Sequence, residues 1–73
     1  MNEFMNALYN SEGREITGYR NTVAFHGTIV NVRARAGNSL SLTVVDLDNN
    51  ETMSIDSEYF FEDGIYTNLH VYF

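Results

Sequence analysis

The chain has 73 residues, of which 44% are hydrophobic and ten are aromatic, so it is too apolar for a disordered protein and too short for a second large domain or a deep cleft. It contains no cysteine, which excludes disulfide bonds and thiolate metal sites, and its formal net charge of −6 opposes binding to phosphate. We expect one domain over residues 1–73.

No segment has the pattern of a membrane helix or a signal peptide. The first ten residues carry no basic region, and nowhere do about 18 consecutive apolar residues occur. Together with the lack of cysteine, this predicts a cytoplasmic protein with no membrane partner.

The charge is unevenly distributed along the chain. Residues 1–36 carry three acids against four arginines, a net charge of +1, whereas residues 37–73 carry seven acids and no base, a net charge of −7. A field of this sign repels phosphate and attracts basic partners.

The N-terminal residues predict a short helix. Met1, Phe4, Met5 and Leu8 follow the i, i+3, i+4, i+7 spacing of one helix face, and the polar residues 10–13 end it. Because so short a helix is not stable alone in water, we expect it to pack on a sheet, with a partner-binding arm as the alternative.

From Glu15 onward the hydrophobic pattern has a period of two, which indicates strands. It changes phase around Gly27, where we expect a bulge or a sharp coil in one long strand. The apolar positions are Val23 and Phe25 before this glycine, and Val30, Val32 and Ala34 after it. Gly37 and Asn38 then predict a tight hairpin turn.

Two further strands complete a predicted three-stranded meander. The returning strand has Leu40, Leu42 and Val44 on one face, with a second phase change at Val45 and Leu47. Residues 48–51 form the next turn, and a third strand follows with two inward positions, Met53 and Ile55.

The C-terminal part has a connection and a last strand. The connection, residues 57–64, carries the consecutive aromatics Tyr59, Phe60 and Phe61. The last strand covers residues 65–73 and alternates between two faces: Leu69, Val71 and Phe73 on one, His70 and Tyr72 on the other.

These elements predict an α+β fold that is mainly β, with a short N-terminal helix packed on an antiparallel meander sheet of four or five strands. Residues 27–33, 40–46 and 53–55 resemble the opening strands of small OB-like or SH3-like barrels, which is the alternative. We favour the open sheet, because the helix needs a sheet face to cover and 73 residues barely suffice for a closed five-stranded barrel.

Arg33 and Arg35 are the candidate nucleic-acid contact, since they lie at i and i+2 on one strand face. Two arginines neutralise only about two phosphates, which is little against the acids that follow. We therefore favour a polar strand face, opposite Val32 and Ala34, whose arginines protect a sheet edge or pair with nearby carboxylates.

No metal, cofactor or catalytic motif is complete. Residues 46–51 resemble the start of a calcium loop, but Glu51 stands where glycine is needed and Ser57 where a bidentate glutamate is needed. His26 and His70 are on separate strands and would meet only if those strands pair, and no nucleophile elbow or phosphate loop accompanies them. We expect no metal, no cofactor and no enzymatic activity.

The acidic block is the candidate partner-binding site, with solubility as the alternative role. Asp46 and Asp48 at i and i+2 on a strand would lie about 7 Å apart, comparable with successive phosphates. Nearby aromatics could anchor a contact with a basic protein. The candidate residues are Asp46, Asp48, Glu51, Asp56, Glu58, Tyr59, Phe60, Glu62, Asp63 and Tyr66.

In size, acidity and absence of cysteine and catalytic motifs, the chain resembles small phage and mobile-element inhibitors of host defence, such as anti-CRISPR and anti-restriction proteins. These inhibitors share no single fold, so the resemblance transfers no residue roles. It implies an inhibitor that occupies a basic, nucleic-acid-binding surface of a larger host protein, in the host cytoplasm if phage-encoded. The alternatives are a nucleic-acid-binding module that uses Arg33 and Arg35, and a homodimeric structural protein joined through its terminal strand.

Overall fold

The computed structural model describes residues 3–20, 22–57 and 66–73, which form one α-helix and one antiparallel sheet of five strands. The elements are α1 (Glu3–Tyr9), β1 (Glu15–Arg20), β2 (Val23–Arg35), the 3-10 turn η1 (Ala36–Asn38), β3 (Ser39–Asp46), β4 (Thr52–Asp56) and β5 (Tyr66–Tyr72). This confirms the predicted mainly β fold with a short N-terminal helix.

The strand order is β4-β3-β2-β1-β5, and each neighbouring pair is antiparallel. The last strand therefore joins β1 rather than β4, which departs from a simple meander. Within the described ranges no pairing joins β4 to β5, so the sheet is open, as predicted, and not a barrel. No helix among these residues is long and apolar enough to cross a membrane.

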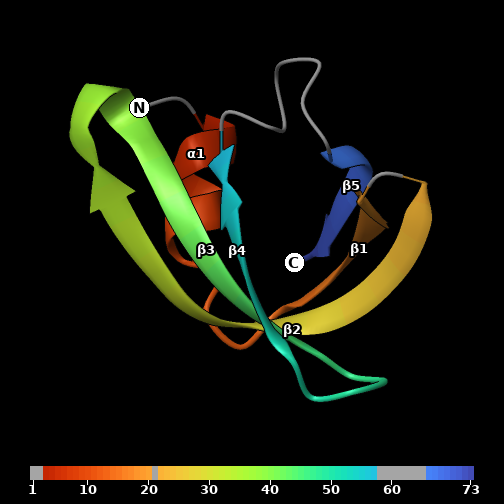
Figure 1. Cartoon of the computed structure of the whole chain (residues 1–73). Helices are drawn as coiled ribbons and strands as arrows, with labels where there is room; N and C mark the ends of the chain where they lie inside the picture. Colours follow the sequence, from red (N-terminus) through yellow and green to blue (C-terminus); the bar gives the residue numbers. More distant parts are fainter. Residues whose placement is uncertain (1–2, 21, 58–65) are drawn as a thin grey trace.

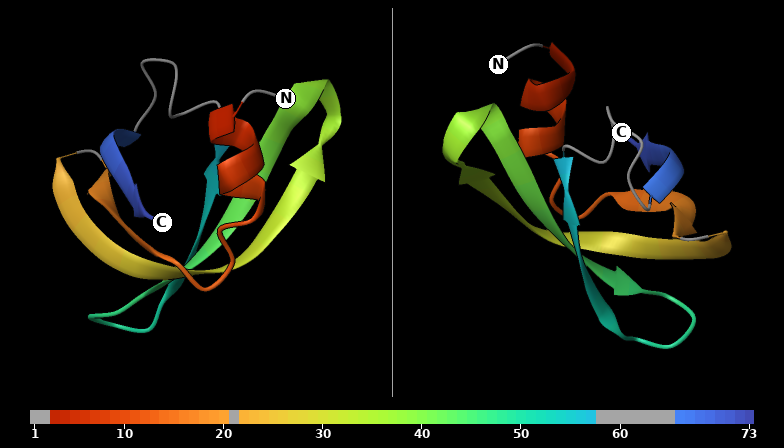
Figure 2. Two further views of the ribbon diagram at one scale, coloured as in Figure 1. Left: turned by 180° about the vertical axis from the view of Figure 1, so that it is seen from behind. Right: turned by 45° about the horizontal axis from the view of Figure 1, so that its top comes forward.

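The sheet curls strongly, and α1 lies on its concave side near β3 and β4 (Figures 1 and 2). The strand β2 makes this possible because its 13 residues span both halves of the sheet. Its first part pairs with β1 and its later part pairs with β3. All core side chains point to this concave side.

The predicted bulge in β2 is present, but it lies at Val30 and not beside Gly27. Ile29 pairs with Val44 and Asn31 with Thr43, so Val30 is the extra residue, and 43% of it is exposed. The prediction that Val30 faces inward is wrong. The inward-facing positions shift by one residue at the bulge, after buried Ile29, and not at Gly27.

Beyond the bulge, Val32 packs against the core while Ala34 is exposed. Ala34 pairs with buried Leu40, so it lies on the concave face, but at the end of the sheet where little covers it. The side chain of Ala34 therefore lies on the predicted face of the sheet, but it is not buried.

The concave face carries one continuous hydrophobic core. It consists of Met5, Leu8, Ile16, Phe25, Ile29, Leu40, Leu42, Val44, Ile55 and Val71, with Val32, Met53 and Leu69 packed against it. The predicted alternation of β3 is confirmed. The predicted phase change at Val45 and Leu47 is wrong. The alternation continues unchanged, and Asp46 takes the next inward position.

The helix contributes Met5 and Leu8 to this core, as predicted, whereas Met1 and the side chain of Phe4 lie outside the described part of the structure. The hydroxyl of buried Ser11 donates a hydrogen bond of 2.5 Å to the carbonyl oxygen of Leu8. The backbone amide of Ser11 donates to the same oxygen at 3.1 Å. Ser11 thus satisfies a carbonyl at the end of the helix that has no partner within it.

Two glycines on the concave face allow the strands to approach closely. A Cβ atom on Gly27 would meet the Val44 side chain and would lie 2.7 Å from the carbonyl oxygen of Val45. A Cβ atom on Gly18 would overlap the side chain of Leu69. The contact of Gly27 with Val45 involves backbone atoms, which cannot rotate away as the Leu69 side chain beside Gly18 can.

We predict that Gly27→Ala lowers the free energy of unfolding by about 1 to 3 kcal/mol, because the added methyl group overpacks the contact between β2 and β3. Urea denaturation measures the change. Ala24→Ser is the matched control, since it also adds one atom to β2 but at an exposed position, and it should change stability by less than about 0.5 kcal/mol. Equal stability of the glycine variant and the wild type would contradict this packing.

Candidate functional site

The turn between β3 and β4 gathers three of the predicted acids, and one of them holds the turn together. Asp46 is only 8% exposed, and its Oδ1 accepts hydrogen bonds from the backbone amides of Asp48, at 2.7 Å, and Asn49, at 3.4 Å. Asp48 and Glu51 are exposed. Because β3 ends at Asp46, this residue and Asp48 do not share a strand face, and that part of the prediction is wrong.

The rest of the turn is built from asparagines and backbone. Asn49 Oδ1 accepts a hydrogen bond from the Glu51 amide at 2.8 Å, and Asn50 has a φ of 59°, a left-handed conformation that asparagine tolerates. The Asp46 amide donates to the Glu51 carbonyl oxygen at 2.8 Å. No three His, Asp or Glu residues in the described ranges are placed to hold a metal ion.

The fourth acid, Asp56, lies at the other end of β4 and forms an ion pair. The distance from Arg35 Nη1 to Asp56 Oδ1 is 2.7 Å. Arg33 is exposed on the convex face, where it pairs in register with Ser41, and it makes no ion pair within the described part of the chain. The two arginines thus differ: one binds the chain's own carboxylate, as predicted, and the other does not.

The remaining candidates lie wholly or partly outside the described residues. Glu58, Tyr59, Phe60, Glu62 and Asp63 lie outside the described residues, as do the aromatics of the predicted connection. Tyr66 begins β5 opposite Arg20, but its side chain also lies outside the described part.

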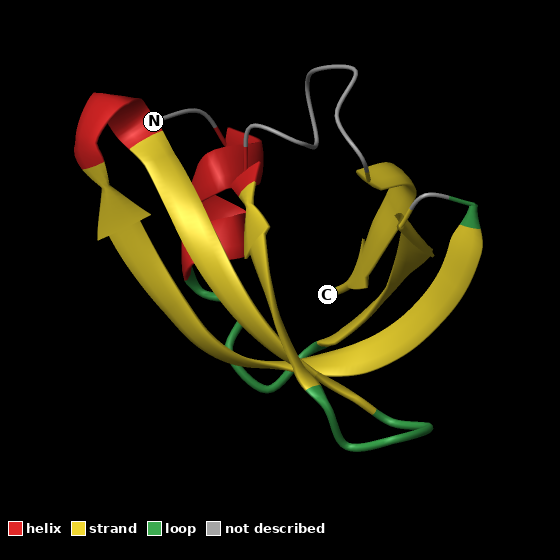
Figure 3. Cartoon of the chain, viewed as in Figure 1, coloured by secondary structure: helices red, strands yellow, loops and turns green. Residues whose placement is uncertain are grey.

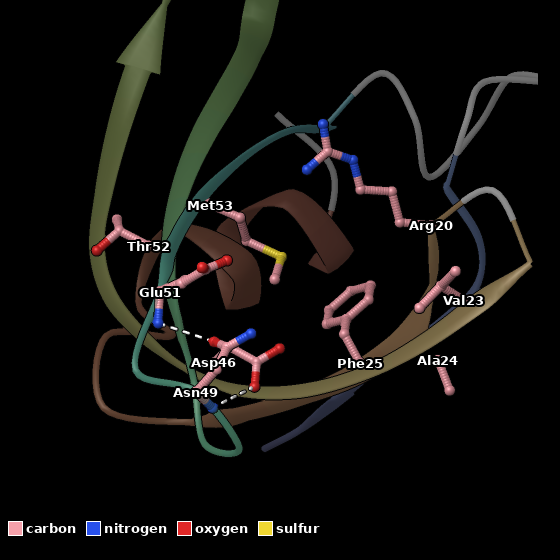
Figure 4. Close-up of a pocket in the computed structure, with 9 residues that line it drawn as sticks. All are labelled: Arg20, Val23, Ala24, Phe25, Asp46, Asn49, Glu51, Thr52 and Met53. Atoms are coloured by element: carbon pink, nitrogen blue, oxygen red, sulfur yellow. Dashed lines mark hydrogen bonds between the residues drawn. The ribbon is translucent and has the colours of Figure 1, made fainter.

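A pocket of about 410 Å³ opens on the concave side, between the β1–β2 and β3–β4 hairpins (Figure 4). Its apolar part is formed by Phe25 and Met53. Asp46 and Glu51 lie on the side of the β3–β4 turn, and Arg20 lies on the opposite side. The lining residues are Arg20, Val23, Ala24, Phe25, Asp46, Asn49, Glu51, Thr52 and Met53.

The sequence interpretation missed this pocket because it misplaced Asp46. Arg20 and Val23 pair in register at the end of the β1–β2 hairpin, and Gly27 pairs with Asp46. The strand alternation of Phe25 and Gly27 was the available signal. Without the pairing register, however, nothing in the sequence brings Arg20 opposite Asp46.

The convex face carries a separate polar cluster around Thr17. His26 Nε2 lies 2.8 Å from Glu15 Oε2, the hydroxyl groups of Thr17 and Tyr72 lie 3.4 Å apart, and the rings of His70 and Tyr72 meet edge to face with centroids 4.4 Å apart. Both histidines pair in register with Thr17. Because β1 lies between them, their Cα atoms are about 10 Å apart, and the strands that carry them do not pair.

Comparison of the chain with protein-family models, curated proteins and solved structures found no match. Assignment of a function therefore depends on the geometry of the turn, the pocket and the surface charges.

We predict that Asp46→Ala lowers the free energy of unfolding by about 1 to 3 kcal/mol, because it leaves the amides of the turn without their charged acceptor. Asp46→Asn keeps a side-chain oxygen and should retain most of the stability. Asp48→Ala is the control, since this exposed carboxylate forms no part of the turn's hydrogen bonds. Denaturant titration of the three variants tests the order, and equal stability of the two alanine variants would contradict it.

Proposed function

We propose that the protein is a non-enzymatic inhibitor whose acidic β3–β4 turn contacts a basic, nucleic-acid-binding surface of a larger protein, in the manner of phage counter-defence inhibitors. The observation that carries the proposal is the exposed pair Asp48 and Glu51. Neither carboxylate forms an ion pair within residues 3–20, 22–57 and 66–73. The turn extends away from α1 at the far end of the sheet (Figure 3).

The positions of Arg33 and Arg35 support this choice of surface. Arg33 and Arg35 lie near the β2–β3 connection, at the opposite end of β3 from the acidic turn. The eight residues of β3 span roughly 25 Å, several times the Debye length of about 8 Å at physiological salt. These arginines therefore do not screen the turn from a basic partner.

The turn also offers an apolar contact. Leu47 is 50% exposed directly beside Asp48, and its amide bonds to the His26 carbonyl oxygen at 2.9 Å. Because this backbone bond already orders the segment, binding through the exposed leucine would require little further ordering of the backbone. Carboxylates around it would set the orientation and the association rate.

Homodimerisation through β5 is the second candidate, because β5 is an edge strand of the described sheet and Tyr72 and Phe73 at its end are exposed. Unpaired strand edges are ready sites for pairing with another chain. Sedimentation at micromolar concentration tests it, and a monomer would remove this candidate.

We predict that reversing both turn acids, with Asp48→Lys and Glu51→Lys, weakens partner binding tenfold or more and flattens its salt dependence, because attraction is replaced by repulsion. The wild-type protein first captures a partner from an extract of the source cells or their host. The purified partner is then titrated with each variant from about 50 to 300 mM salt.

The matched control reverses Glu3 and Glu12, which are exposed acids outside the turn, and changes the net charge equally. If both double variants lose affinity equally, net charge and not the turn explains binding. If the chain instead retains oligonucleotides at low salt, and loses them on changing Arg33 and Arg35 to glutamine, it is a nucleic-acid-binding module and the proposal is wrong.

A further inference from the structure

We infer that the pocket between the two hairpins binds a cationic group on an aliphatic stem, with arginine as the ligand of best fit. The guanidinium would lie between Asp46 and Glu51, and the stem would lie over Phe25 and Met53. Where the arginine belongs to a protein, this inference deepens the proposed function and rests on it.

The first support is the carboxylate of Asp46, which lies in a residue more than nine-tenths buried. Both turn amides bond to Oδ1, and Oδ2 accepts no hydrogen bond from the described residues. Figure 4 shows this carboxylate directed toward the space beside Phe25. No buried side-chain oxygen among the described residues lacks a hydrogen-bond partner, so the unpartnered Oδ2 is open to this space, where a charged donor can reach it.

The second support is the composition of the surrounding wall. The Glu51 carboxylate points into the same space in Figure 4, although its backbone belongs to the turn. Phe25 and Met53 supply an aromatic ring and a flexible thioether, surfaces on which the apolar stem of a long cationic side chain packs. The volume of about 410 Å³ is within the range of small-ligand pockets.

The pocket wall opposite the two carboxylates carries Arg20, which already has an interaction partner of its own. The choice of ligand therefore rests on the two carboxylates and the apolar wall. The planar guanidinium also matches two carboxylates better than a compact ammonium does.

The test is an NMR titration of the full chain with three probes: L-arginine, agmatine, which lacks the carboxylate, and a peptide with one internal arginine. We expect saturable shifts of the amides of Phe25, Asp46 and Met53. Glu51→Gln should weaken binding about tenfold, the loss of one charge-assisted pair. The side chain of Glu51 forms no hydrogen bond with a described residue, so this substitution should leave the fold unaffected.

Asp46→Asn, which keeps an oxygen for the turn, should weaken binding similarly, and Glu12→Gln, an exposed acid outside the pocket, should not. Tighter binding of L-arginine than of agmatine would identify a free amino acid as the ligand. Tightest binding of the peptide would identify a protein side chain as the source. Either result supports the site.

Absence of saturable shifts with all three probes would overturn the inference, as would equal weakening by Glu12→Gln and Glu51→Gln. These failures are distinct from failure of the proposed function. Asp48→Lys alters the turn without touching the pocket lining, so partner binding that depends on Asp48 while arginine does not bind would leave the function standing and remove the pocket.

Discussion

The close approach of β2 and β3 at Gly27 is the constraint on which the rest of the structure depends. Among the described residues a single seven-residue helix covers the sheet, and the described side chains that it places in the core are those of Met5 and Leu8. A flat sheet would leave much of its apolar face in water. The sheet instead curls until its own side chains cover one another, and this requires a residue without a side chain at position 27, where a Cβ atom would collide with β3.

The same curvature creates the candidate site. Because α1 lies over one half of the concave side (Figure 1), the described residues that line the pocket in the other half come from the β1–β2 and β3–β4 hairpins. The inward position that follows Val44 on β3 falls in this space, and it is occupied by Asp46 and not by an apolar residue. Asp46, at an inward-facing position on the edge of the core, thus forms a polar wall of the pocket.

Local patterns were sufficient for much of the fold and for little of the site. The alternation of Leu40, Leu42 and Val44 and the turn chemistry of residues 48–51 are set by neighbours in sequence, and the structure has both where the sequence places them. The position of the bulge at Val30 and the pairing of β5 with β1 depend on contacts between distant segments. The pocket could not be predicted without the pairing register, since Arg20 on β1 and Asp46 on β3 line the same space only because β2 pairs with both strands.

Asp46 connects stability with recognition, because one carboxylate performs both tasks with different oxygens. Oδ1 fixes the turn that presents Asp48 and Glu51, and Oδ2 faces the pocket. A ligand at Oδ2 would therefore stabilise the turn on which the exposed acids lie, since any group that binds only the folded state favours it. In the converse direction, a partner that orders the turn would position this oxygen for a cation. The pocket and the acidic turn would then act as one contact surface, with the buried carboxylate at its centre.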